Sequence, residues 1–204
     1  MNIKNLLNID QKIILASKSP RRKHLLGLLG FDFDIIPADI DEEAVSYHHP
    51  GEMVMKLAEM KAINAAKKAD ENALIIGSDT TVELKNKVLN KPKDEDHAVE
   101  MLKTLSGKKH KVLSGVSLAM RTRSDIITLT AYEETTVTFR DLSEAEIKAY
   151  VKSGSPMDKA GAYGIQDDFG AVFVKNINGC YYNIVGLPLQ VLYIKLIEFQ
   201  QKYL

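Results

Sequence analysis

The chain has 204 residues, enough for one larger domain or two closely joined lobes with a sizeable core. Lysine plus arginine and aspartate plus glutamate number 27 each, so no global field attracts nucleic acid or an anionic membrane, and any polyanion site must be local. The single cysteine, Cys180, excludes an internal disulfide, and neither a signal-peptide pattern nor a bilayer-spanning apolar run occurs, so we expect a cytoplasmic protein.

Apolar and amphipathic segments alternate through the first half of the chain, which predicts strands and helices in turn. The segments typical of strands are residues 12–16, 31–40 and 73–77. The second of them leads into the acidic residues 41–43. Helices are predicted over residues 20–29, capped by Ser19 and ended by Gly30, over 51–69, and over 94–105, capped by Asp94.

The second half favours strands. Residues 110–120 and 125–140 have strand patterns, and a helix over 142–154 begins with Ser143 and Glu146 at capping-box spacing. An Asn-Gly pair at 178–179 between apolar runs predicts a hairpin, and Pro188 opens a closing amphipathic helix. We therefore expect a mixed α/β fold, in a single domain over residues 1–204.

Two adjacent arginines follow Ser-x-Ser-Pro at the start of the first predicted helix. Capping by Ser19 puts Arg21 and Arg22 in the first turn, where the helix dipole disfavours cations. An anion held between them would remove this cost, and a helix N-terminus with the serine hydroxyls of Ser17 and Ser19 suits a phosphate. The alternative is that both side chains extend into solvent or pair with a nearby carboxylate.

Three further residues are candidates for the same chemistry. Asp79 follows the apolar strand 73–77, at a carboxyl end where open α/β sheets bind ligands, although such an aspartate is often only a turn or cap residue. Lys61 falls beside the apolar stripe of the helix 51–69, so its ammonium either extends to the helix edge or reaches a polar cleft. Glu42 belongs to the acidic run, which is either a solvated loop or within reach of a metal.

The glycine-rich segment 156–170 is either an ordinary loop or a segment whose glycines let a ligand approach the backbone closely. In the second case Gln166 recognises the edge of a nucleotide base through its amide donor and acceptor. Lys91 in Leu-Asn-Lys-Pro and the segment LSGKKHKV add further cations, most of which we expect to be solvated. The five histidines lack metal-binding spacing, and no common phosphate-loop pattern occurs. Any bound nucleotide must therefore be held by other means.

Six blocks in order, SKSPRR, GSDTTV, LNKP, LSGKKHKV, DKAGAYGIQ and NGCYYNIVGLP, resemble the Maf family of nucleoside triphosphate pyrophosphatases over nearly the whole chain. The resemblance implies an α/β fold similar to that of the inosine triphosphate pyrophosphatases: a mixed twisted sheet flanked by helices, with two lobes around a central cleft. It also implies hydrolysis of a nucleoside triphosphate to the monophosphate and pyrophosphate with a divalent metal.

Three residues are those of the family branch that acts on dTTP and UTP: Arg21, Thr80 and Gln166. The branch acting on 7-methylguanosine triphosphate typically has an aromatic residue, glutamine and glutamate at these positions. Lys18 and Ser78 depart from the common glycine and alanine, and Ser78 also occurs in the second branch. CTP and modified pyrimidine nucleotides stay open as substrates.

Our hypothesis for the mechanism makes Asp79 a general base, or a metal ligand that orients and activates water, for attack at the α-phosphate. Glu42 is the second expected ligand of magnesium or manganese. The triphosphate is expected to be neutralised by Arg21, Arg22, Lys61 and Lys91, with hydrogen bonds from Ser17 and Ser19.

A non-catalytic nucleotide-binding regulator of cell division and septum formation is the alternative function, because relatives are linked with septum formation. Asp79 together with Lys61 favours an enzyme, since pure phosphate binding needs donors but no carboxylate facing them. Nucleic-acid binding through the KKHK run is disfavoured, because the charge is balanced and no aromatic stacking surface accompanies the run. A homodimer is suggested by the family only.

Overall fold

The computed structural model describes residues 3–42, 45–166 and 169–204. The chain divides into two compact units, which we call unit 1 and unit 2. Unit 1 comprises Met1–Asp79, Ser114–Glu133 and Gly186–Leu204, and unit 2 comprises Thr80–Leu113 and Glu134–Val185. In the part of the chain that is described, no helix is both long and apolar enough to cross a membrane.

The strands form a seven-stranded mixed sheet in the order β2-β1-β3-β5-β6-β7, with β4 paired to β3. Their bounds are β1 Ile13–Leu15, β2 Phe33–Ile35, β3 Leu74–Leu84, β4 Lys87–Leu89, β5 Lys109–Arg121, β6 Ile126–Phe139 and β7 Val174–Asn178. β1 runs parallel to β2 and β3, whereas β4 is antiparallel to β3 and β7 is antiparallel to β6. The mixed α/β sheet predicted from the sequence is confirmed, and the central cleft stays a prediction.

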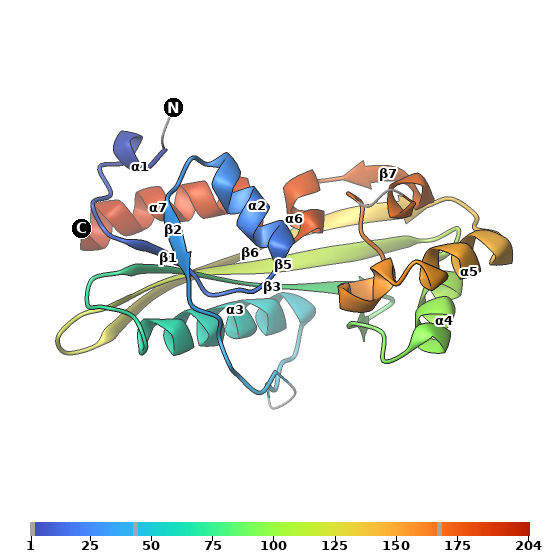
Figure 1. Ribbon diagram of the computed structural model, residues 1–204, viewed down its shortest axis with the longest axis horizontal. Coiled ribbons are helices and arrows are strands. Elements are labelled where there is room, and N and C mark those ends of the chain that lie inside the picture. Colours follow the sequence, from blue (N-terminus) through green and yellow to red (C-terminus); the bar gives the residue numbers. More distant parts are fainter. Residues whose placement is uncertain (1–2, 43–44, 167–168) are drawn as a thin grey trace. The chain divides into compact units, whose positions relative to one another are not determined.

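Unit 1 places helices on both faces of its strands. α3 (Pro50–Ala66) runs along one face, and α2 (Pro20–Leu28) and α7 (Leu189–Tyr203) lie on the other, with the short α1 (Ile3–Leu6) near the N-terminus (Figure 1). α3 lies very close to the sheet: a Cβ built on Gly77 would be 2.2 Å from the carbonyl oxygen of Ala58. Glycine in the strand thus permits backbone contact that any side chain would prevent.

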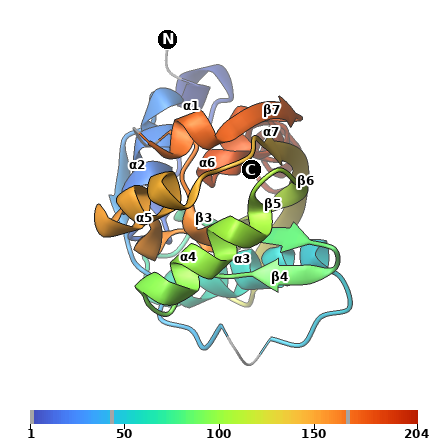
Figure 2. The same ribbon diagram turned by 90° about the vertical axis from the view of Figure 1, so that its right-hand side faces the viewer.

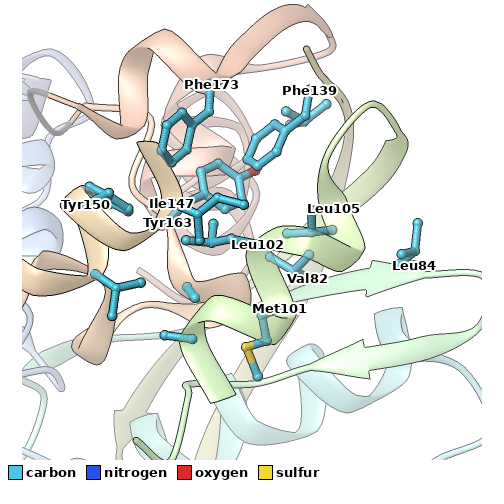
Figure 3. Close-up of a cluster of buried hydrophobic side chains, with 14 of the residues drawn as sticks. Val82, Leu84, Met101, Leu102, Leu105, Phe139, Ile147, Tyr150, Tyr163 and Phe173 are labelled. Carbon is cyan, nitrogen blue, oxygen red and sulfur yellow. The ribbon is translucent and has the colours of Figure 1, made fainter. Parts of the chain in front are cut away.

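Unit 2 carries α4 (Glu95–Leu105), α5 (Glu144–Lys152) and α6 (Tyr181–Val185), with 3-10 turns at Ser155–Asp158, Ala160–Ala162 and Gly170–Phe173. α4 packs beside α5 (Figure 2). The core of unit 2 contains aromatic rings and leucines (Figure 3). The Phe139 and Tyr163 ring centroids are 4.7 Å apart in an edge-to-face arrangement, and those of Tyr150 and Phe173 are 5.2 Å apart.

The predicted helix caps are confirmed. The Ser19 hydroxyl accepts from the backbone N–H of Arg22, and the Asp94 carboxylate accepts from that of His97 at 2.7 Å. Ser143 and Glu146 form a complete capping box at the start of α5. These caps satisfy backbone donors that have no partner within their helices, which is why the sequence signals for helix starts were reliable.

The strand ends differ from the predictions. β2 is limited to three residues, whereas β3 extends to Leu84, so Asp79 lies inside a strand rather than beyond its end. The parallel pairing of β3 with β1 stops at Ile76, and β3 continues because Val82–Leu84 pair with β4. Asp79 therefore still lies past the carboxyl end of the parallel pair.

The hairpin predicted at Asn178-Gly179 is wrong. β7 ends at Asn178, and the chain continues into α6 instead of a second strand. Thr135 explains this path: its hydroxyl accepts from the Cys180 backbone N–H at 3.0 Å, and the Asn183 amide donates to the same oxygen at 2.9 Å. These long-range bonds outweigh the local turn preference of Asn-Gly.

Candidate active site

One lysine joins the two predicted carboxylates in unit 1. The Lys61 Nζ donates to Asp79 Oδ1 at 2.6 Å and lies 2.7 Å from Glu42 Oε1. The Lys61 and Asp79 side chains are each 11% exposed, whereas that of Glu42 is 55% exposed. The Lys61 ammonium thus lies in a polar cluster with both carboxylates.

The close packing of α3 on β3 brings this pair together. Gly77 faces α3, and because strand side chains alternate, Asp79 two residues later faces α3 as well. Lys61 lies one turn after Ala58, whose carbonyl is nearly in contact with Gly77. Gly77 therefore sets the distance over which the Lys61 ammonium must reach.

The N-terminus of α2 carries the predicted phosphate-binding residues. Ser17 is buried, and its hydroxyl accepts from the Ser19 N–H at 3.2 Å and from Arg22 Nη1 at 3.4 Å. The Arg22 Nε donates to the Gly186 carbonyl at 2.9 Å. Two separate bonds thus orient the Arg22 guanidinium, and Arg21 lies beside it in the first helical turn.

The charges of unit 1 act on one another. The pKa of Arg22 lies below its usual value, first because burial disfavours the charged guanidinium and also because Arg21 repels it. The carboxylates of Asp79 and Glu42 act in the opposite direction on that pKa. Arg21, Arg22, Lys61, Asp79 and Glu42 are therefore one electrostatic cluster, with cations in excess over carboxylates.

Unit 2 holds the other predicted residues. Thr80 is half-buried and directly follows Asp79 in β3, and Lys91 and Gln166 are exposed. Asn90, next to Lys91, accepts from the Gly161 N–H at 3.2 Å, so the Leu-Asn-Lys-Pro segment lies beside the glycine-rich segment that carries Gln166. Residues 167 and 168 of that segment, and Glu43 of the acidic run, lie outside the described residues.

The possible metal ligands are few. Within residues 3–42, 45–166 and 169–204, no group of three or more His, Cys, Asp or Glu side chains could hold a metal ion. Asp79 and Glu42 meet at one ammonium and provide hard carboxylate oxygens. Magnesium and manganese commonly bind one or two protein carboxylates and complete their coordination with substrate phosphates and water, so this pair fits such an ion.

Sequence reasoning missed the roles of Gly77 and Gly186. Gly186 accepts from Arg22 and, at 3.1 Å, from the Ser78 hydroxyl. Gly186 belongs to the NGCYYNIVGLP block, which was the available signal. A pattern of side chains, however, does not show which backbone carbonyl accepts hydrogen bonds. Gly77 begins the GSDTTV block, but that pattern did not reveal that the strand packs against a helix at this residue.

The site combines a helix N-terminus, arginines and paired carboxylates on a mixed α/β fold. Sites of this kind bind and hydrolyse phosphate esters or anhydrides. The chain belongs to the Maf-like protein family, whose model matches residues 12–199. A dTTP/UTP pyrophosphatase of Bacillus cereus strain G9842 is 46% identical over 93% of this chain and 96% of the relative.

A dTTP/UTP pyrophosphatase of Bacillus cereus strain ATCC 10987 is 45% identical over 93% of this chain and 90% of the relative. Among solved structures, a HAM1 protein from Coxiella burnetii matches with a TM-score of 0.46 and 16% identity, over 92% of this chain and 99% of that chain.

Proposed function

We propose that this protein hydrolyses dTTP and UTP to the nucleoside monophosphate and pyrophosphate. The observation that carries the proposal is the ammonium of Lys61 between Asp79 and Glu42, within the same charge cluster as Arg22. Relatives named dTTP/UTP pyrophosphatase, 46% identical over most of the chain, support the substrate class.

Binding comes from the cations of unit 1. The N-terminus of α2 presents backbone N–H groups and the positive end of the helix dipole, which favour a phosphate. Arg21 and Arg22 flank this position, and a guanidinium can hold a phosphate through two parallel hydrogen bonds. Thr80, Lys91 and Gln166 of unit 2 belong to the proposal as further substrate contacts, with Arg21, Thr80 and Gln166 selecting the pyrimidine nucleotide.

Hydrolysis requires a water molecule, a proton acceptor and a stabilised leaving group. The water oxygen bonds to the α-phosphorus, the bond from that phosphorus to the bridging oxygen breaks, and pyrophosphate leaves with the electron pair. The Asp79 carboxylate takes the proton of the water, and Lys61, bonded to Asp79 Oδ1, keeps that carboxylate oriented. The arginines offset the negative charge that develops on the pyrophosphate.

Glu42 would hold the divalent cation, magnesium or manganese, and Asp79 would join it there in the alternative in which Asp79 is a metal ligand instead of the general base. When bound, such an ion supplies charge neutralisation for the triphosphate and polarises its phosphoryl oxygens. The cytoplasm as the location rests on the sequence, and a homodimer as the assembly rests on the family resemblance only. A link with septum formation belongs to the alternative function, a non-catalytic nucleotide-binding regulator.

The test is pyrophosphate release from a panel of triphosphates: dTTP, UTP, CTP, modified pyrimidine nucleotides and purine controls, each with magnesium, manganese or neither. We expect release from dTTP and UTP with the nucleoside monophosphate as co-product. Binding of these nucleotides without release would instead favour the non-catalytic regulator.

Asp79→Asn tests the assignment of the proton acceptor. The amide is expected to lower kcat by about 1000-fold, the order of magnitude for loss of a general base. Asp34→Asn is the matched control, because Asp34 pairs with Lys12 in an exposed salt bridge of the same unit. Equal kcat values for wild type and Asp79→Asn would remove Asp79 from the chemistry.

A further inference from the structure

Two donors from distant parts of unit 1 meet at the carbonyl oxygen of Gly186. The Arg22 Nε donates to it at 2.9 Å, and the Ser78 hydroxyl donates to it at 3.1 Å. Gly186 itself has φ of 121°, a conformation that residues with a side chain rarely adopt. The backbone at this point is therefore held in an unusual orientation that directs its carbonyl toward both donors.

The Ser78 hydroxyl is completely buried, with no exposed surface. A buried hydroxyl without a partner costs roughly 1–3 kcal/mol, so its bond to Gly186 is what makes a serine tolerable there. An alanine would fit the same strand position without any polar requirement. The bond consequently points to a role for the hydroxyl at the Gly186 carbonyl rather than in packing.

Ser78 and Asp79 are consecutive residues of β3, so their side chains point to opposite faces of the strand. Asp79 bonds to Lys61 of α3 on one face, and Ser78 bonds to Gly186 on the other. These two consecutive residues of β3 therefore contact two cations of the candidate site: Asp79 bonds to Lys61 directly, and Ser78 is linked to Arg22 through the shared Gly186 carbonyl.

The Arg22 guanidinium is oriented at two points, by Gly186 through Nε and by Ser17 through Nη1. A planar group held at two of its nitrogens has a defined plane, which directs the remaining N–H groups. If the Gly186 carbonyl turned away, the Nε contact would be lost while the charge of Arg22 remained. The direction of the guanidinium, more than its charge, depends on that carbonyl.

We propose that Ser78 is a positioning residue, whose hydroxyl holds the Gly186 carbonyl where it orients Arg22 toward the phosphates of the substrate. This role rests on the proposed function, in which Arg22 binds the triphosphate. Ser78 touches neither substrate nor reacting atoms, and acts through Gly186 and Arg22.

The expected effect is on the rate more than on binding. In Ser78→Ala, Arg22 keeps its charge and its contact with Ser17, so the attraction for the triphosphate in the ground state is largely retained. A guanidinium that is misdirected loses its contacts with the charge developing in the transition state. We expect kcat for dTTP to fall about tenfold, with KM changing less than about threefold.

Ser117→Ala is the matched control. Ser117 is also fully buried in a strand of unit 1, where its hydroxyl accepts from Thr130 at 2.9 Å. Both substitutions remove one buried hydroxyl, so both are expected to lower the melting temperature by similar amounts. Only Ser78→Ala is expected to lower kcat, and a similar fall in both variants would reduce the effect to general destabilisation and overturn the proposal.

A double-mutant cycle with Arg22→Lys identifies the path of the effect. Lysine keeps the positive charge but cannot bond to Gly186 and Ser17 through one rigid plane. If Ser78 acts through Arg22, adding Ser78→Ala to Arg22→Lys lowers kcat by less than twofold further. A full additional tenfold loss would show independent actions and overturn the proposal.

The wild-type assay separates this inference from the proposed function. Pyrophosphate release by the wild type together with an unchanged kcat in Ser78→Ala overturns the positioning role alone. No release by the wild type from any triphosphate of the panel overturns the proposed function, and the positioning role with it.

Discussion

The core of unit 2 differs in composition from the core cluster of unit 1 that lies between the strands and α3. A core cluster of unit 1 between the strands and α3 is mostly alanine: Ala16, Ala62, Ala65, Ala66, Ala69, Ala73 and Ala119, with Ile14 and Ile75. The core cluster of unit 2 is aromatic and leucine-rich, around Phe139, Tyr150, Tyr163 and Phe173. Small side chains let a helix approach a sheet, whereas large ones bury more apolar area.

Close approach is what the charged cluster of unit 1 needs. The absence of a side chain at Gly77 leaves room for the carbonyl oxygen of Ala58. At Gly115, an added Cβ would likewise lie 2.1 Å from the carbonyl oxygen of Val54. With α3 this near, the Lys61 ammonium reaches Asp79. We infer that unit 1 uses small residues for the precision of its site, and that the aromatic core of unit 2 mainly provides stability.

Phe139→Ala tests the stability side of this comparison. Phe139 is 1% exposed and packs edge-to-face with Tyr163 at 4.7 Å and with Phe173 at 6.0 Å. We expect a loss of about 3–5 kcal/mol in the free energy of unfolding, measured by denaturant titration. The milder Phe139→Leu serves if the alanine variant does not fold. A kcat that fell while stability held would contradict the division of roles.

His110 makes the stability of unit 2 depend on pH. Its pKa is lowered to about 4 because burial disfavours the charged imidazolium, and its Nε2 lies 2.8 Å from the Tyr163 hydroxyl. As pH falls below the usual pKa of about 6.5 the unfolded chain binds a proton first, so stability falls between pH 6.5 and 4. The loss attributable to His110 is about 3 kcal/mol over that window.

His110→Gln is expected to flatten this slope in denaturant titrations at pH 4.5 to 6.5. His24→Gln, at an exposed position of α2, is the control. An identical slope in wild type and His110→Gln would mean that His110 titrates alike in the folded and unfolded chains.

Gly77→Ala tests the site side of the comparison. The added Cβ would meet the Ala58 carbonyl at 2.2 Å, so α3 must move and carry Lys61 away from Asp79. A displacement of about 1 Å can cost about 100-fold in rate, and we expect a fall of that order in kcat. Gly27→Ala in α2 is the control, because a Cβ there has nothing within 4 Å. Full activity in Gly77→Ala would show that the close packing is not required.

The predictions from sequence succeeded where neighbouring residues decide the structure. The caps at Ser19, Asp94 and Ser143 depend on residues within one helical turn, and all three occur. The position of Lys61 beside the apolar stripe of α3 was likewise visible in the helical period. The prediction of a hairpin turn at Asn178-Gly179 was wrong because Thr135, distant in sequence, bonds to Cys180 and Asn183.

The sequence by itself determined the α/β alternation, the charged N-terminus of α2 and the blocks that assign the chain to the Maf-like family. Only the tertiary structure decided that Lys61 bonds to Asp79 and that Gly186 accepts from both Arg22 and Ser78. Capping and periodicity arise from interactions within a few residues, so a sequence displays them directly. Contacts between distant segments depend on how closely backbones pack, and a glycine such as Gly77 sets that distance without a side chain that a pattern could reveal.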